Sequence, residues 1–101
     1  MTTYRMDNGV IVDTDKAKRS WDEDLYWDGN NWISRATDSQ WDHEMLMLSR
    51  KGRYYIWRTS NRQGHMPSAQ WLTDKEATVW LLLNEIDVPD DLLNNVEDVS
   101  E

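Results

Sequence analysis

The chain has 101 residues and a formal charge of −8, from 19 acidic and 11 basic side chains. This length allows one domain with a modest core. Without cysteine, the chain cannot build a disulfide framework, a thiolate zinc site or a cysteine nucleophile. The surplus of acid argues against autonomous DNA or RNA binding, which needs a basic surface to neutralise phosphate.

Neither end of the chain carries a membrane or export signal by composition. The first ten residues lack the apolar segment of a secretory signal. The longest apolar run, Val79–Leu83, is too short to cross a bilayer. We therefore expect the protein to be cytoplasmic. If a phage encodes it, the compartment would be the cytoplasm of the host.

The first predicted element is a short hairpin. Tyr4–Met6 and Val10–Val12 flank Asn8-Gly9, and Asn-Gly is the strongest two-residue hairpin signal because both residues accept a positive φ. A short helical turn follows through Lys16–Arg19. The acidic stretch Ser20–Leu25 is predicted to be a solvated loop.

A polar turn is predicted at Asp28–Asn31, because Asp-Gly and Asn-Asn tolerate left-handed backbone and can bond back to the main chain. The turn leads into a predicted strand at Trp32–Ser34. Arg35–Gln40 is then polar and typical of a turn.

The central predicted element is a hairpin within Glu44–Ser60. Two apolar runs flank Arg50-Lys51-Gly52, a three-residue loop with a glycine placed for positive φ. Pairing Ser49 with Arg53 sets the register. The predicted pairs are Leu48 with Tyr54, Met47 with Tyr55, Leu46 with Ile56, Met45 with Trp57, Glu44 with Arg58 and His43 with Thr59. Both faces are apolar, so we expect the hairpin inside a sheet with another element packed on each face.

The last third of the chain predicts a loop, a strand and two helices. Ala69–Leu72 is the predicted strand. Thr73 and Glu76 form a capping box for an apolar helix that Asp87-Val88-Pro89 ends. Pro89 suits the first position of a second short helix, through about Asn95.

Together these elements predict an α+β fold in one domain over residues 1–101. It consists of a small antiparallel β-sheet of about four to five strands, with a C-terminal helix packed on one face and a second short helix. The acidic tail, from about residue 97 to 101, is expected to fray.

No pattern in the chain predicts catalysis. Asp22–Asp24 with Asp28-Gly29 matches a calcium loop only in part, because Glu23 is inserted and no correctly spaced glutamate follows. His43 and Glu44 face opposite sides in the predicted register, and no serine lies in a nucleophile elbow. We therefore predict no enzymatic activity, no metal and no cofactor.

Charge is unevenly distributed along the chain. Residues 45–73 carry five bases and no acid, whereas residues 74–101 carry nine acids and one base. In the basic section, Arg58 is expected to pair with Glu44 while the loop bases are solvated; the alternative is a small anion or nucleic-acid patch with aromatic rings between the bases. The acidic section is either a solvated tail or a carboxylate array that imitates phosphates for a DNA-binding partner.

Residues 27–44 carry the pattern W-D-G-N-N-x-I-S-x-A-T-x-S-Q-W-D-H-E. In this block the chain resembles a set of small, uncharacterised bacterial proteins with the pattern W-D-G-N-N-x-I-S-x-A-T-G-S-Q-W-(D/E)-H-E. The resemblance covers roughly residues 16–93. The chain departs from it at Asp38, where glycine is usual, and at Ser60–Gly64, where S-Q-W-Q-G is usual. The resemblance supports the fold and implies no established activity.

We interpret the chain as a small acidic protein-binding inhibitor, phage-encoded and anti-CRISPR-like, that occupies a basic or nucleic-acid-binding surface of a host protein without binding nucleic acid or membrane itself. The alternative is a bacterial regulatory interaction module that recognises a peptide or ligand through its polar turns. A third hypothesis is an enzyme or small-ligand binder with His43 near Ser39 or Gln40 in a pocket. The predicted partner-binding residues are Asp87, Asp90, Asp91, Asp28, Asn30, Asn31, Arg62 and Gln63.

Overall fold

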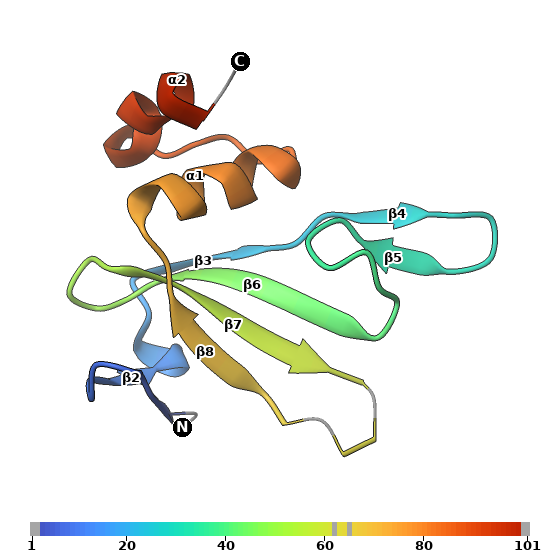
Figure 1. Ribbon diagram of the computed structural model, residues 1–101, viewed down its shortest axis with the longest axis horizontal. Helices are drawn as coiled ribbons and strands as arrows, with labels where there is room; N and C mark the ends of the chain where they lie inside the picture. Colours follow the sequence, from blue (N-terminus) through green and yellow to red (C-terminus); the bar gives the residue numbers. More distant parts are fainter. Residues whose placement is uncertain (1–2, 62, 65, 100–101) are drawn as a thin grey trace.

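The computed structural model describes residues 3–61, 63–64 and 66–99, and it has the predicted α+β fold (Figure 1). The central antiparallel sheet has the strand order β3-β6-β7-β8. Its strands are β3 (Arg19–Asp22), β6 (Asp42–Leu48), β7 (Tyr54–Ser60) and β8 (Ser68–Trp71). Two smaller two-stranded sheets are formed by β1 (Thr3–Arg5) with β2 (Ile11–Asp13) and by β4 (Leu25–Trp27) with β5 (Trp32–Ser34). The helical elements are η1 (Thr14–Lys16), α1 (Asp74–Leu83), η2 (Asp90–Asn95) and α2 (Val96–Val99), of which η1 and η2 are 3₁₀ helices.

The register of β6 and β7 is the predicted one at every pair. The turn between them places Gly52 at a φ of 90°, which an L side chain rarely adopts. Arg58 and Glu44 are paired across the two strands, with Nε 2.8 Å from Oε2. Local turn chemistry and strand alternation therefore specify this hairpin.

Each face of the central sheet is covered, as predicted. On one face Leu46 and Ile56 pack against Trp80 and Leu81 of α1. On the other face Met47 and Tyr55 pack against Val12 of the N-terminal hairpin. The two sets are kept apart because successive side chains of a strand point to opposite faces. Figure 1 shows α1 and the β1–β2 hairpin on opposite sides of the sheet.

Helix α1 begins at the predicted capping box and ends earlier than predicted. Thr73 and Glu76 exchange side-chain and backbone hydrogen bonds of 3.1 and 3.0 Å. The helix ends at Leu83, because Glu85 adopts a φ of 58° and the Glu85 and Ile86 N–H groups bond back to the carbonyls of Leu82 and Leu81. This is a Schellman motif, and the sequence reasoning missed it because the left-handed residue is a glutamate and not a glycine.

Two predictions on the N-terminal side are wrong. Ser20–Leu25 is not a loop: β3 pairs with β6, and Trp21 is buried against the sheet core. The other concerns the turn or short helix through Lys16–Arg19: the cap expected within Asp13–Asp15 is present, because the Asp13 side chain accepts from the Asp15 N–H at 3.0 Å, but the turn spans Thr14–Lys16 and does not reach Arg19. Arg19 belongs to β3 because the strand pairs with β6 from that residue onward.

The second short helix begins after Pro89, as predicted, and is continued by α2. Residues 97–99, the described part of the tail that was expected to fray, are helical within α2, and residues 100–101 lie outside the described part. Within the described residues, no helix combines the length and apolar character that crossing a membrane requires.

Candidate functional site

The β4–β5 hairpin forms a separate two-stranded arm that extends from the edge of the molecule (Figure 1). Its tip is the predicted turn. Asp28 Oδ1 accepts the N–H groups of Asn30 and Asn31, both at 2.8 Å, and Gly29 has a φ of 106°. These two hydrogen bonds lower the pKa of Asp28 below its ordinary 3.8, so the carboxylate is ionised at neutral pH.

The arm has one buried face and one exposed face. Ile33 is buried, and Tyr26 donates from its hydroxyl to Asp38 at 3.3 Å. On the opposite face, Trp27 and Trp32 are cross-strand partners whose ring centroids lie 5.5 Å apart in an edge-to-face arrangement. Their exposed fractions are 55% and 59%. The two indoles therefore contact each other and leave more than half of their surface open.

Acidic residues are frequent in the arm and in the segments that flank it. Residues 22–42 carry six acids and one base, Arg35. Arg35 pairs with Asp24 at the foot of the arm and also lies over the Tyr26 ring. The Asp24 N–H donates to the side chain of Asn84 at 2.9 Å, which joins the arm to the end of α1. The arm therefore carries an aromatic pair and one carboxylate, Asp28, and it is anchored at its base.

A second cluster links the foot of the arm to the central sheet. Glu23 Oε1 lies 2.6 Å from His43 Nδ1, and Ser34 Oγ donates to Glu23 Oε2. Burial raises the pKa of Glu23 above its ordinary 4.5, against the lowering effect of the His43 hydrogen bond and charge. The sequence interpretation of Glu23 as part of a solvated loop is therefore wrong, because its side chain is only 9% exposed.

This cluster does not have the geometry of a nucleophilic triad. In a triad the imidazole lies between the hydroxyl and the carboxylate, so that it can take the hydroxyl proton. Here the carboxylate of Glu23 lies in the middle. Ser34 is fully buried, and its Oγ also accepts the Ala36 and Thr37 N–H groups. The arrangement positions strands and does not activate Ser34.

The structure does not pair His43 with Ser39 or Gln40. Ser39 Oγ accepts the backbone N–H groups of Trp41 and Asp42, which is a turn-forming role. A hollow of about 210 Å³ beside His43 is lined by Thr37, Thr59 and Ser60 among others. Among the described residues, no three histidine, aspartate or glutamate side chains are grouped closely enough to hold a metal ion.

The predicted partner-binding residues fall in three separate regions. Asp87 is exposed between α1 and η2, and Asp90 and Asp91 are exposed in the first turn of η2, although Asp91 also accepts the Tyr54 hydroxyl at 2.9 Å. Asp28 and its neighbouring asparagines lie at the tip of the arm. Gln63 is exposed in the β7–β8 loop, and Arg62 lies outside the described residues. Figure 1 shows these regions at different corners of the molecule, so they do not form one surface.

The sequence predicts some half-exposed tryptophans among the seven but does not identify Trp27 and Trp32 as the exposed pair, because composition alone does not separate core from surface rings. The available signal was their position on either side of the same turn. Residues placed in this way face each other across a hairpin, and their side chains lie on the same face of it. Comparisons of the chain with models of protein families, with curated proteins and with solved structures found no match.

Proposed function

We propose that the chain is a protein-binding module that inserts the Trp27–Trp32 pair into an apolar pocket of a partner whose rim is basic. The observation that carries the proposal is the exposure of two indoles in edge-to-face contact on a projecting hairpin. Tryptophan dominates the binding energy of protein interfaces because it buries a large apolar area with few rotatable bonds. An isolated exposed side chain would need no explanation, but a paired set on one face of an arm does.

Charge supports the choice of a basic partner. The arm carries one carboxylate, Asp28, and no basic residue from Leu25 to Ser34, within a chain of net charge −8. Complementary charge around an apolar anchor steers the encounter and excludes acidic competitors. In the fuller form of the proposal, the basic surface is the one with which the partner binds nucleic acid, and the chain inhibits it by occupying that surface.

The test compares arm variants for capture of proteins from a bacterial lysate, with quantitative mass spectrometry. Trp27→Ser with Trp32→Ser removes the anchor. Trp41→Ser is the matched control, because Trp41 is also exposed, at 46%, but lies outside β4 and β5. Backbone amide NMR spectra of all variants confirm that the central sheet is intact.

The proposal predicts a protein whose capture falls by about thirty-fold in the double variant, as expected for loss of a hot spot worth about 2 kcal/mol. The same capture is unchanged in Trp41→Ser and weakens as salt is raised. Equal capture by the double variant, or affinity that does not depend on salt, would overturn the proposal.

A further inference from the structure

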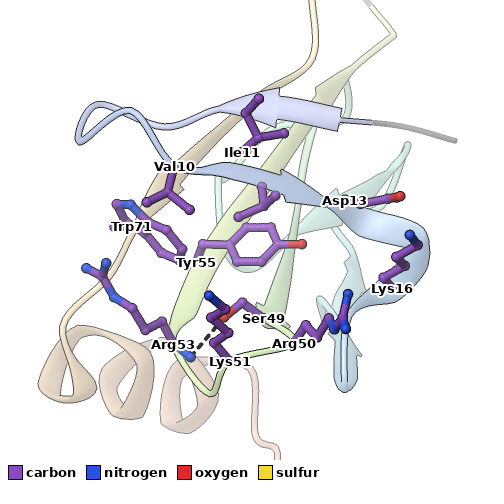
Figure 2. Close-up of a pocket in the computed structure, with 11 residues that line it drawn as sticks. Val10, Ile11, Asp13, Lys16, Ser49, Arg50, Lys51, Arg53, Tyr55 and Trp71 are labelled. Carbon is purple, nitrogen blue, oxygen red and sulfur yellow. Dashed lines mark hydrogen bonds between the residues drawn. The ribbon is translucent and has the colours of Figure 1, made fainter.

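A cavity of about 680 Å³ lies between the N-terminal hairpin and the β6–β7 turn (Figure 2). Segments distant in sequence form its wall: β2, η1, the β6–β7 turn and the adjoining parts of β7 and β8. Its volume falls within the range of about 300–1,000 Å³ that is typical of small-molecule sites. No part of the arm contributes to it, so its role is separate from the proposed protein interface.

The cavity is basic in an acidic protein. Lys16, Arg50, Lys51 and Arg53 line it, with Asp13 as the single carboxylate. Within the described part of the chain, Lys16, Arg50 and Lys51 make no ion pair. Three cations and one carboxylate around one hollow give it a net positive charge that attracts an anion, although all three cations are exposed and salt screens part of the attraction.

A buried hydroxyl gives a second, independent indication of a ligand. Tyr55 lines the cavity and is fully buried, and its hydroxyl has no hydrogen-bond partner among the described residues. Buried polar groups without partners are rare in native proteins. Burial, then the charge of Asp13, raises the pKa of Tyr55, so the group stays protonated and can donate. Figure 2 shows the hydroxyl directed toward the side of the cavity where Asp13, Lys16 and Arg50 lie.

The opposite side of the cavity is apolar. Val10 lies there with the indole of Trp71, and the Arg53 guanidinium stacks on that indole at 4.1 Å from the ring centre. Val10 is 46% exposed. The site therefore offers flat apolar surface at one end and cationic and hydroxyl donors at the other.

We propose that this cavity binds an organic phosphate of mononucleotide size. Its phosphate would lie among Lys16, Arg50 and the Tyr55 hydroxyl, and its flat body against Val10 and Trp71. Arginine and lysine together favour a phosphate because the guanidinium fork matches its oxygens and the ammonium adds charge. A polynucleotide is disfavoured because the chain outside this cavity is strongly acidic.

The binding test uses AMP, phenyl phosphate, adenosine and inorganic phosphate as probes, followed by backbone amide NMR of the full chain. The proposal predicts that AMP or phenyl phosphate binds with a Kd below about 1 mM. Shifted amides should cluster in residues 10–16 and 49–55, and adenosine and inorganic phosphate should each bind at least about tenfold more weakly, because each lacks one half of the recognised ligand. If neither phosphate ester binds by about 10 mM, or if the shifts scatter over the surface, the proposal is wrong.

Variants then separate a built site from general charge attraction. Arg50→Gln and Tyr55→Phe should each weaken binding of the phosphate ester by about tenfold, the loss of one good hydrogen bond to an anion. Lys75→Gln makes the same unit change of charge on α1, outside the cavity, and should leave the affinity unchanged. Equal weakening by Arg50→Gln and Lys75→Gln would show only non-specific attraction. Unchanged binding by Tyr55→Phe would remove the hydroxyl from the site and overturn the proposal as stated.

Discussion

The same substitution, tyrosine to phenylalanine, should change the stability of the protein in opposite directions at two adjacent tyrosines. Tyr54 and Tyr55 are both buried, on opposite faces of β7. The Tyr54 hydroxyl donates to Asp91 at 2.9 Å, whereas the Tyr55 hydroxyl has no partner within the described residues. Replacing each by phenylalanine removes one oxygen atom and leaves the ring.

The expected free energies of unfolding follow from those partners. A buried unsatisfied polar group costs about 1–3 kcal/mol. The void left by one oxygen, about 10 Å³ at about 24 cal/mol per Å³, returns only about 0.2 kcal/mol of that. We therefore expect Tyr55→Phe to stabilise the ligand-free protein by about 1 kcal/mol. Tyr54→Phe loses a hydrogen bond to a carboxylate and should destabilise it by about 1 kcal/mol, the low end because Asp91 is exposed and rehydrates.

Urea denaturation followed by far-ultraviolet circular dichroism measures both variants against the unmodified chain. In thermal unfolding, each change corresponds to a Tm shift of about 4–8 °C, upward for Tyr55→Phe and downward for Tyr54→Phe. If Tyr55→Phe lowers the stability by 1 kcal/mol or more, as a rough threshold, its hydroxyl has a partner in solution and the reasoning is refuted. Stabilisation together with weaker binding of phosphate esters would show that the hydroxyl is kept for a ligand at the expense of the free fold.

Three further predictions concern buried polar contacts. Asn84→Ala removes the acceptor of the Asp24 N–H and a donor to the Trp80 carbonyl. We therefore expect the free energy of unfolding, measured by urea denaturation, to fall by about 2–3 kcal/mol, and a fall of less than about 0.5 kcal/mol would contradict this prediction. Glu44→Ala leaves the buried Trp80 indole N–H without an acceptor and should cost about 2 kcal/mol, whereas Glu44→Gln retains an acceptor and should cost less. Because burial raises the pKa of Glu23, the folded state binds the Glu23 proton more tightly than the unfolded state does. The free energy of unfolding should therefore fall as pH rises from 4.5 through the folded pKa. Glu23→Gln should flatten the plot of stability against pH in this range, and an unchanged slope would show that Glu23 does not cause the dependence.

The central hairpin and α1 could be predicted because their signals are local. Gly52 fixes the turn, strand alternation then fixes every partner from Leu48 to His43, and Thr73 with Glu76 fixes the start of the helix. In each case the deciding residues lie within a few positions of each other. The resulting pairing of Glu44 with Arg58 followed from the register alone.

Features that depend on distant segments could not be predicted. β3 contains Ser20 and Asp22 and has the composition of a loop, and only its pairing with β6, more than 20 residues later, makes it a strand. Glu23 is buried because His43 and Ser34 approach from other strands. The basic section of the sequence was recognised, but Lys16 joins it only through packing of the N-terminal hairpin. Partner binding by Asp87, Asp90 and Asp91 stays a prediction.

The two covers of the central sheet come from opposite parts of the chain, and this arrangement imposes an order on folding during synthesis. The N-terminal hairpin is translated before β6 and β7, so the face carrying Met47 and Tyr55 can be covered as soon as those strands pair. The face carrying Leu46 and Ile56 waits for α1 and then for Leu92, both of which follow β7 in the chain. During that interval we expect a nascent chain to expose an apolar surface, and therefore to be most prone to chaperone binding and aggregation on this face when translation stalls before the helices.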